Sequence, residues 1–193
     1  TQAESSAASD VYKRQVGIID AVGSGVDPQR VGQRVGAMMP KVGFGGYAEQ
    51  VCVPARRTAA VPDGVTPVDA VALGLNYITA HQIIHRIAGL TPGQSILIHG
   101  AAGGVGTATL DLGRLAGLTM FGTASAKKHD IVRQRGGTPI DYRSEDFVEV
   151  IAEHGRVDAV LDPIGGAHLR RSYAALAEGG TLVMFGICLL YTS

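Results

Sequence analysis

The amino-acid sequence predicts an α/β protein in which a small β-rich region precedes a parallel sheet flanked by helices. Three observations indicate this fold class. Strand and helix patterns alternate from residue 95 to residue 186, turn residues are closely spaced between residues 16 and 67, and the pattern changes at about Val68. With 46% hydrophobic and 18% charged residues, the chain has enough apolar material for a buried core.

The first region consists of short apolar runs that end in glycine or proline. Strands are predicted within residues 16–26 (VGIIDAVGSGV), 31–39 (VGQRVGAMM) and 45–55 (GGYAEQVCVPA). Cys52 alternates with polar neighbours in the last of these runs, so we expect its side chain to lie in the core. Turn residues at this spacing are typical of a small barrel or sandwich.

The second region begins with helical spacing over residues 67–90, with Asp69 near the start and Gly89 near the end. Strands are predicted beyond it at residues 95–99, 118–124, 138–142, 157–162 and 181–186. Helices are predicted between them at residues 105–116, 128–135, 147–153 and 168–177. Such alternation predicts a parallel sheet with right-handed crossovers.

Composition excludes several classes of function. The formal net charge is zero and there is no basic block, so no nucleic-acid partner is expected. The only cysteines, Cys52 and Cys188, cannot build a disulfide framework or a cysteine-rich zinc site. No apolar run approaches the roughly 18 residues of a membrane span, and no signal peptide is visible. We therefore expect a cytoplasmic protein without a membrane partner.

A glycine-rich loop lies between the strand at 95–99 and the helix at 105–116, with glycine at every third position. This spacing is a variant of the dinucleotide-binding Rossmann motif, in which glycines let the backbone approach a pyrophosphate and the helix supplies free N–H donors. We expect nicotinamide-dinucleotide binding here; the alternative is a purely structural turn. The residues expected to contact the cofactor are Gly100, Ala101, Gly103, Gly104, Val105 and Gly106.

The next strand indicates which dinucleotide is bound. An NAD site usually has Asp or Glu at the end of this strand, roughly 20 residues beyond the loop. No acid occurs around Ser125, which is followed instead by Lys127 and Lys128. A hydroxyl and ammonium groups suit a 2′-phosphate, so NADP(H) is favoured over NAD(H). The alternative interpretation is that the lysines form a solvated helix start.

Together these segments resemble the medium-chain dehydrogenase/reductase superfamily, close to its quinone oxidoreductase branch. The matches follow the family's order over nearly all of residues 16–187, and they include TPGQSILIHGAAGGVG, GTASAKKHDIVRQRGGTPIDYRSEDF and DAVLDPIGGAHLRRSYAALAEGGTLVMFGI. The resemblance implies a partial GroES-like β domain at residues 16–67. It also implies a Rossmann doubly wound parallel sheet, with five of six strands, at residues 68–187.

The resemblance also implies roles for individual residues. Ser125, Lys128 and Tyr142 match the family's side chains that hold the 2′-phosphate, with Lys127 as a rival for the lysine role. Three further matches are expected beside the nicotinamide: Thr79, Phe185 and Gly186. Asp162, Pro163 and Gly165 match a loop at the carboxyl end of a strand, where open α/β sheets bind ligands.

No metal is expected. Zinc-dependent members of the family take a ligand from four residues before the matched threonine, and that position here is Leu75. His81 and His85 are four residues apart on a predicted helix, but no third ligand of suitable spacing is visible, so we expect packing or surface roles. His99 is expected to be buried structure rather than a catalytic base. No catalytic residue is identified.

The two ends of the chain differ from the rest. Residues 1–15 and 188–193 are expected to be non-native tails, with ordinary disordered termini as the alternative. The resemblance implies further family segments before residue 16 and after residue 187, so an incomplete fragment is expected.

The expected activity is NADPH-dependent hydride transfer to a quinone, enone or aldehyde, with a homodimer as the full-length form. The alternatives are a zinc-type alcohol dehydrogenase-like protein and a non-catalytic nucleotide-binding family member.

Overall fold

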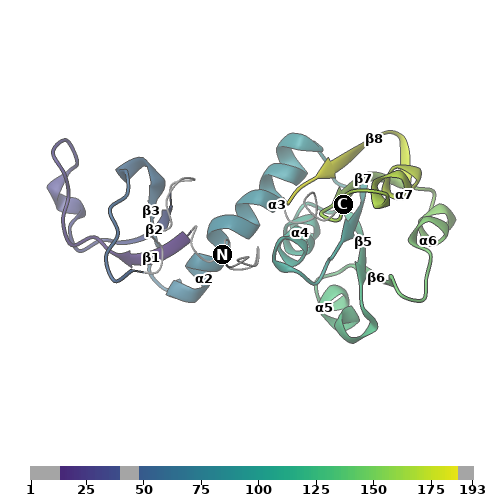
Figure 1. The fold of residues 1–193 in the computed structure, drawn as a ribbon, viewed down its shortest axis with the longest axis horizontal. Helices are drawn as coiled ribbons and strands as arrows, with labels where there is room; N and C mark the ends of the chain where they lie inside the picture. The colour runs from purple at the N-terminus through teal and green to yellow at the C-terminus, as the bar shows by residue number, and fades with distance from the viewer. Residues whose placement is uncertain (1–13, 40–47, 187–193) are drawn as a thin grey trace, which may run out of the picture. The chain divides into compact units, whose positions relative to one another are not determined.

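The computed structural model describes residues 14–39 and 48–186. The chain divides between Leu75 and Asn76 into two compact units, and each contains its own sheet (Figure 1). Residues 1–13 and 188–193 of the expected tails lie outside the described residues, whereas Arg14 and Gln15 begin the first strand.

The first unit is built on a three-stranded antiparallel sheet. Its strands are β1 (Arg14–Ile18), β2 (Arg34–Met38) and β3 (Thr58–Ala60), with β2 in the centre. Val35 of β2 is 5% exposed and belongs to the small buried core. Two short 3₁₀ turns precede β2 and β3: η1 (Pro28–Arg30) and η2 (Ala55–Arg57).

The strand predicted at residues 45–55 is wrong over its described part, because residues 48–55 form no strand. Pro54 starts the 3₁₀ turn η2, and a proline cannot donate to a sheet ladder. The observed strand, β3, follows that turn. The prediction that Cys52 is a core residue is also wrong: its thiol is free and exposed, because the inside–outside alternation of a strand does not apply here.

The helix predicted from residue 67 is confirmed as a segment that crosses the division between the units. Thr66 caps its start, since its hydroxyl accepts from the Asp69 amide at 3.1 Å and donates to the Asp69 carboxylate at 2.7 Å. Two π-helical turns interrupt the α-helix. The elements in order are α2 (Pro67–Ala72), η3 (Leu73–Tyr77), α3 (Ile78–Gln82) and η4 (Ile83–Ile87).

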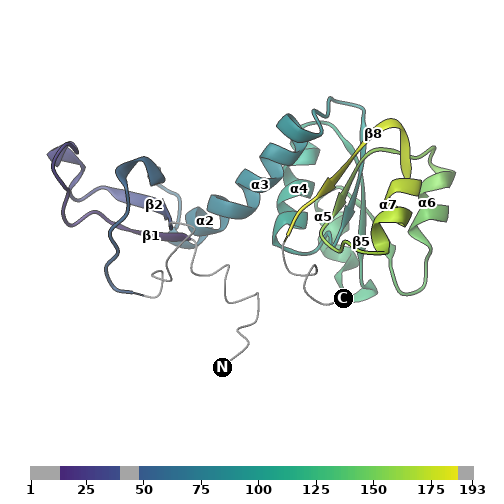
Figure 2. The ribbon, with the colours of Figure 1, turned by 45° about the horizontal axis from the view of Figure 1, so that its top comes forward.

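The second unit contains a five-stranded parallel sheet in the order β6-β5-β4-β7-β8, which confirms the predicted fold class. Its strands are β4 (Ser95–His99), β5 (Thr119–Ala124), β6 (Thr138–Asp141), β7 (Val157–Asp162) and β8 (Leu176–Met184). The helical elements between them are α4 (Gly104–Leu115), η5 (Ala126–Lys128), α5 (His129–Gln134), α6 (Phe147–Glu153) and α7 (His168–Ala174). Figure 2 shows β8 at one edge of this sheet.

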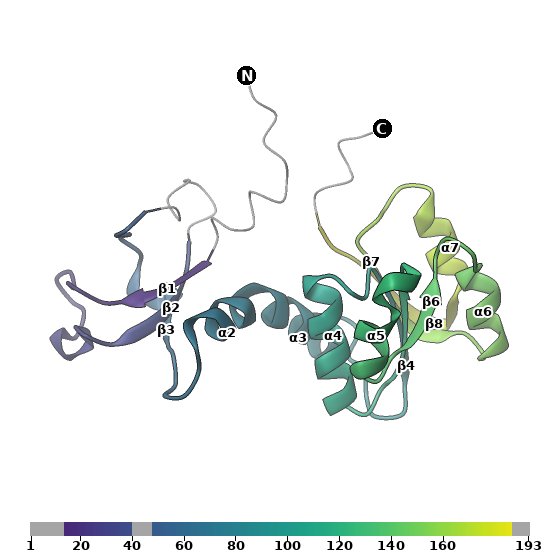
Figure 3. The ribbon, with the colours of Figure 1, turned by 90° about the horizontal axis from the view of Figure 1, so that it is seen from below.

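Helices cover both faces of this sheet (Figure 3). Successive residues of a strand point to opposite faces, so β4 contributes to two buried clusters. Ile96 and Ile98 pack in one cluster with residues of η4, α4 and α5. Leu97 packs in the other with Phe147 of α6 and with residues of β5 and β7.

The bounds of β4, β7 and α6 agree with the sequence prediction, whereas the junction of α7 and β8 does not. The helix ends at Ala174 rather than residue 177, and β8 begins at Leu176 rather than residue 181. Leu176 pairs with Val157, the register then shifts, and Thr181 pairs with Ala159. Gly179 and Gly180 therefore lie in a bulge inside the strand.

Candidate functional site

The carboxyl end of the parallel sheet brings together the loops that follow its strands. The chain runs from β4 outward through β5 to β6, and then returns to place β7 and β8 on the other side of β4. In open α/β sheets, ligands bind at this reversal, outside the carboxyl ends of the strands. The loops beginning at Gly100 and Pro163 flank it here, because β4 and β7 are paired neighbours.

The glycine loop is folded tightly at this position. Gly100 has a φ of +65°, which favours glycine, and its carbonyl accepts from the Gly103 amide at 2.8 Å. The buried Ala101 donates its amide to the Thr123 carbonyl of β5 at 3.0 Å. A Cβ on Gly106 would lie 2.5 Å from the Gly100 oxygen, so only glycine lets α4 start this close to the loop.

The first turn of α4 presents backbone N–H groups that its N-cap residue does not cap. Gly103 is its N-cap and supplies no side-chain cap, and the first turn contains no acid. The first-turn amides of a helix have no acceptor within the helix, and the helix dipole favours an anion there. Gly104 and Val105 contribute such amides, Val105 packing partly against the buried core. This arrangement is suited to a pyrophosphate.

Asn76 is a residue at this site that the sequence analysis did not identify. A Cβ on Gly104 would lie 2.5 Å from the Asn76 amide nitrogen, so the side chain of Asn76 lies against the first turn of α4. In this segment the sequence predicted a cofactor contact only for Thr79, which is half-buried in α3. Asn76 lies in η3 and Thr79 in α3 of one continuous helical segment, and α3 packs against α4.

The residues expected at the 2′-phosphate lie at neighbouring strand ends. Ala124 of β5 pairs with Asp141 of β6, so Ser125 and Tyr142 both directly follow paired residues. Lys128 ends the turn η5 that Ser125 precedes, and it is exposed, as is the rival Lys127. Arg143, also missed from the sequence, places its guanidinium carbon 5.7 Å from the centre of the Tyr142 ring.

The remaining two predicted residues follow β8. The Phe185 amide donates to the Asp162 carbonyl at 3.3 Å, which ties this strand end to that of β7. The Phe185 ring packs partly against the core, and Gly186 follows with a φ of +89°. These residues reach the same edge of the sheet as the glycine loop.

Two groups of residues that contain histidine could suggest a metal site. His81 and His85 are exposed, with ring centres 4.6 Å apart. Within the described ranges, one group of three has metal-ligand character: His99, Asp162 and His168, with ligand atoms within 4.8 Å of one another. Both ring nitrogens of His99 and both Asp162 oxygens already have hydrogen-bond partners in the protein. A metal would have to displace these bonds.

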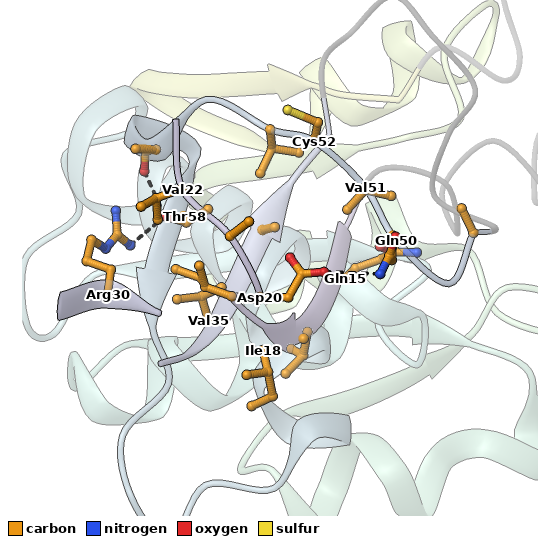
Figure 4. A pocket seen from close by; sticks show the side chains of 18 of the residues that line it. Gln15, Ile18, Asp20, Val22, Arg30, Val35, Gln50, Val51, Cys52 and Thr58 are labelled. Atoms are coloured by element: carbon orange, nitrogen blue, oxygen red, sulfur yellow. Dashed lines mark hydrogen bonds between the residues drawn. The ribbon is translucent and has the colours of Figure 1, made fainter. Parts of the chain in front are cut away.

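A cavity of about 1010 Å³ lies in the first unit rather than at this sheet edge. Figure 4 shows its lining, with Arg30 donating to Thr58 at 2.8 Å and Gln50 donating to Asp20 at 3.1 Å. The other labelled side chains there are mostly apolar, and Cys52 stands at its rim. The charged groups that line this cavity do not form a cluster that suggests a chemical reaction. The glycine loop is therefore the better candidate for the functional site.

Known proteins resemble this chain over most of its length. A family model described as zinc-binding dehydrogenase matches residues 104–192. The synaptic vesicle membrane protein VAT-1 homolog of Rattus norvegicus is 41% identical over 180 residues, which are 91% of this chain and 44% of that protein. The chain therefore spans less than half the length of this relative. Within the described residues, no helix is long and apolar enough to cross a bilayer.

Two solved structures share the fold over most of the chain. The Escherichia coli quinone oxidoreductase complexed with NADPH superimposes with a TM-score of 0.85 at 29% identity, covering 91% of this chain and 55% of that one. The CurK enoyl reductase has a TM-score of 0.85 at 29% identity, covering 93% of this chain and 54% of that one.

Proposed function

Because the chain belongs to the medium-chain dehydrogenase/reductase superfamily and is quinone oxidoreductase-like, we propose that it binds NADP(H) for hydride transfer to a quinone or conjugated carbonyl. The observation that carries this proposal is the glycine loop between β4 and α4. Its N-cap residue, Gly103, has no side chain to cap the first turn of α4, and a Cβ on Gly106 would collide with backbone atoms of the loop. These features fit a pyrophosphate.

The preference for NADP(H) rests on the charges at the adenosine end. Lys128 and Ser125 follow β5, where an NAD site would carry an acid. Arg143 beside Tyr142 adds a second cation at the end of β6. A phosphate with two negative charges is better accommodated by this set than an unsubstituted ribose.

Bound NADPH would supply the hydride. The residues of this chain would bind and orient it: the glycine loop at the pyrophosphate, Ser125 and Lys128 at the 2′-phosphate, and Thr79, Phe185 and Gly186 beside the nicotinamide. No side chain of the chain is assigned as the acid, since a quinone can take its proton from solvent. The NADPH complex of the quinone oxidoreductase and the name of the enoyl reductase support this acceptor class. The same proposal includes an aldehyde as a further acceptor. It also includes a cytoplasmic location and a homodimer as the full-length form.

Cofactor choice is the direct test. The substitution Lys128→Gln removes one ammonium group, and a charged hydrogen bond contributes roughly 1.5–3 kcal/mol. We expect NADPH binding, measured by calorimetry, to weaken about tenfold or more while NADH binding changes little. Lys127→Gln tests the rival lysine, and it should weaken NADPH binding less than Lys128→Gln does. Equal losses for both cofactors in Lys128→Gln would contradict the assignment of the 2′-phosphate site.

Turnover is a separate question from binding. NADPH oxidation should be followed with a panel of small quinones and enoyl thioesters, using the chain that binds the cofactor. Oxidation of NADPH by either class supports the enzyme. Binding without turnover across both classes would favour the non-catalytic nucleotide-binding alternative.

A further inference from the structure

Behind the carboxyl edge of the sheet, five polar side chains form a continuous buried network in the second unit. They come from β5, β4, β7 and α7: Thr123, His99, Asp162, His168 and Ser172. Four of them are at most 3% exposed, and only His168 is partly accessible. Polar groups this deeply buried are costly unless they are paired, so the pairing is informative.

One end of the network is the Asp162 carboxylate. Its Oδ2 accepts from the Ser172 hydroxyl at 2.6 Å and from His168 Nδ1 at 2.9 Å. Its Oδ1 accepts from the amides of Ile164 and Gly165 at 2.7 and 3.0 Å. Burial alone would raise the pKa of Asp162, but the hydrogen bonds from His168, Ser172 and the two amides outweigh it and lower the pKa to about 2. The carboxylate is therefore ionised and accepts all four bonds.

The ionised Asp162 carboxylate determines which group donates and which accepts in the other hydrogen bonds of the network. Ser172 has one hydroxyl proton and gives it to Asp162, so its oxygen accepts from His99 Nε2 at 3.2 Å. Burial, reinforced by His168, lowers the pKa of His99 to about 3, so this ring is neutral. With the proton on Nε2, His99 Nδ1 accepts from the Thr123 hydroxyl at 3.1 Å. The Thr123 oxygen then accepts from the Gly100 amide at 3.3 Å.

The His99 ring is also held by packing. It meets the Phe147 ring of α6 edge-on with centres 4.6 Å apart, and the His168 ring edge-on with centres 4.4 Å apart. Edge-to-face contacts of this kind are favourable in a buried site. A rotation of the ring would exchange its donor and acceptor and break the bonds on both sides. The network therefore has one arrangement.

At each of its two ends, the hydrogen-bond network reaches a loop that is expected to contact the dinucleotide. Gly100 opens the glycine loop, and Ile164 and Gly165 belong to the loop after β7, where Gly165 has a φ of +75°. The Asp162 carbonyl additionally holds the Phe185 amide at the end of β8. One set of buried side chains thus joins three strand ends at the carboxyl edge.

We propose that His99 and Ser172 are positioning residues, which couple the glycine loop to the loop after β7 and hold both in the arrangement that receives the dinucleotide. This inference rests on the proposed function, because it concerns the same site. Neither side chain is placed in contact with the cofactor: both lie beneath the loops and act through Thr123 and Asp162.

The test compares NADPH affinity in Ser172→Ala and Thr123→Val, two substitutions on opposite sides of His99. Each removes one hydroxyl from a buried site, and we expect NADPH to bind about tenfold more weakly to each. Thr123→Ser retains the hydroxyl and should restore most of the affinity lost in Thr123→Val. The double variant should lose less than the product of the two single losses, since either break already interrupts the same chain of bonds.

Ser95→Ala is the matched control for Ser172→Ala. The Ser95 hydroxyl also donates to an aspartate of β7, reaching Asp158 at 3.0 Å, but at the amino end of the sheet. Both substitutions break a hydroxyl–carboxylate bond within the same unit. We expect Ser95→Ala to lower the unfolding midpoint with no change in NADPH affinity. Equal loss of affinity in the two alanine variants would overturn the proposal, as would strictly multiplicative losses in the double variant.

The Gly100 amide gives a second readout that needs no cofactor. In ¹⁵N-labelled protein, Ser172→Ala should shift the Gly100 amide resonance, although the Gly100 amide is bonded to Thr123 and not to Ser172, whereas Ser95→Ala should not. If the wild-type chain fails to bind NADPH and this shift is still seen, the proposed function fails and the coupling stands. If NADPH binds and neither the shift nor the affinity responds to Ser172→Ala, the coupling fails and the proposed function stands.

Discussion

At the residue scale, Gly106 shows that the loop can require glycine for space, even where the backbone angle is ordinary. Its missing Cβ would lie 2.5 Å from the Gly100 oxygen and 2.7 Å from backbone atoms of Ala101. Both neighbours are main chain, so a side chain cannot simply rotate away. The third glycine of the motif is therefore a packing requirement between α4 and the loop, and the proposed pyrophosphate site depends on it.

Gly106→Ala should accordingly damage both stability and binding. Overpacking a tight contact costs roughly 1–3 kcal/mol, and the loop that must move is the one expected to hold the pyrophosphate. We expect a lower urea midpoint and NADPH binding too weak to measure by calorimetry. Gly36→Ala, in β2 with nothing within 4 Å of the added Cβ, is the control and should lose neither. An unaltered urea midpoint in Gly106→Ala would contradict the packing argument.

The buried pair of His99 and Asp162 predicts how stability depends on pH. The pKa of His99 falls from 6.5 to about 3 on folding, so between these values the unfolded chain binds the extra proton and acid favours unfolding. Asp162, lowered from 3.8 to about 2, acts in the same direction: its contribution is present above its unfolded pKa and is lost as the pH falls toward 2. The ionisable groups that act electrostatically on His99 are His168, Asp162 and Arg171.

We therefore expect His99 alone to cost the folded state about 2 kcal/mol between pH 6.5 and pH 4.5, from roughly 1.4 kcal/mol per pKa unit. His99→Gln cannot titrate, so its unfolding free energy, measured by urea titration at each pH, should change less over this window. A slope as steep as that of the wild type in His99→Gln would show that other groups control acid unfolding.

At the scale of elements, periodic and buried segments were predictable and irregular ones were not. β4 and β7 are buried on both faces and mostly apolar, and α6 begins at Phe147 directly after the capping residue Asp146, so the local pattern predicted their bounds. The start of β8 could not be predicted, because glycines such as Gly179 occur in both turns and bulges, and only pairing with β7 distinguishes the two.

The candidate site divides in the same way. The glycine loop is contiguous in sequence, so its position before α4 followed from the pattern alone. His99 was expected to be buried, and it is 1% exposed. Its partners could not be predicted, because Thr123 and Ser172 are 24 and 73 residues away. Thr123 meets His99 through the parallel pairing of β4 with β5, and Ser172 meets it through the packing of α7 against the sheet. Asn76 likewise reaches Gly104 only through the packing of a separate helical segment.

At the scale of the whole molecule, the two units differ in what the dinucleotide is expected to touch. Every residue predicted to contact it, from Thr79 to Gly186, belongs to the second unit. The two large buried clusters of the described residues also begin no earlier than Ile83. Core and proposed binding site thus coincide in one unit, which can be stabilised by a ligand independently of the first.

Hydrogen exchange with and without NADPH tests this division. A ligand at 100 times its Kd stabilises the state that binds it by about 2.7 kcal/mol. Some amides exchange only when that unit unfolds, and their exchange should slow roughly a hundredfold. We expect this protection in the buried strands β4, β5 and β7, and little change in β1 and β2. The Lys128→Gln variant at the same NADPH concentration should show less protection in the same strands, because less of it is bound. Equal added protection in β1 and β2 would mean that the two units unfold together, and the dinucleotide would then stabilise the chain as a single cooperative unit.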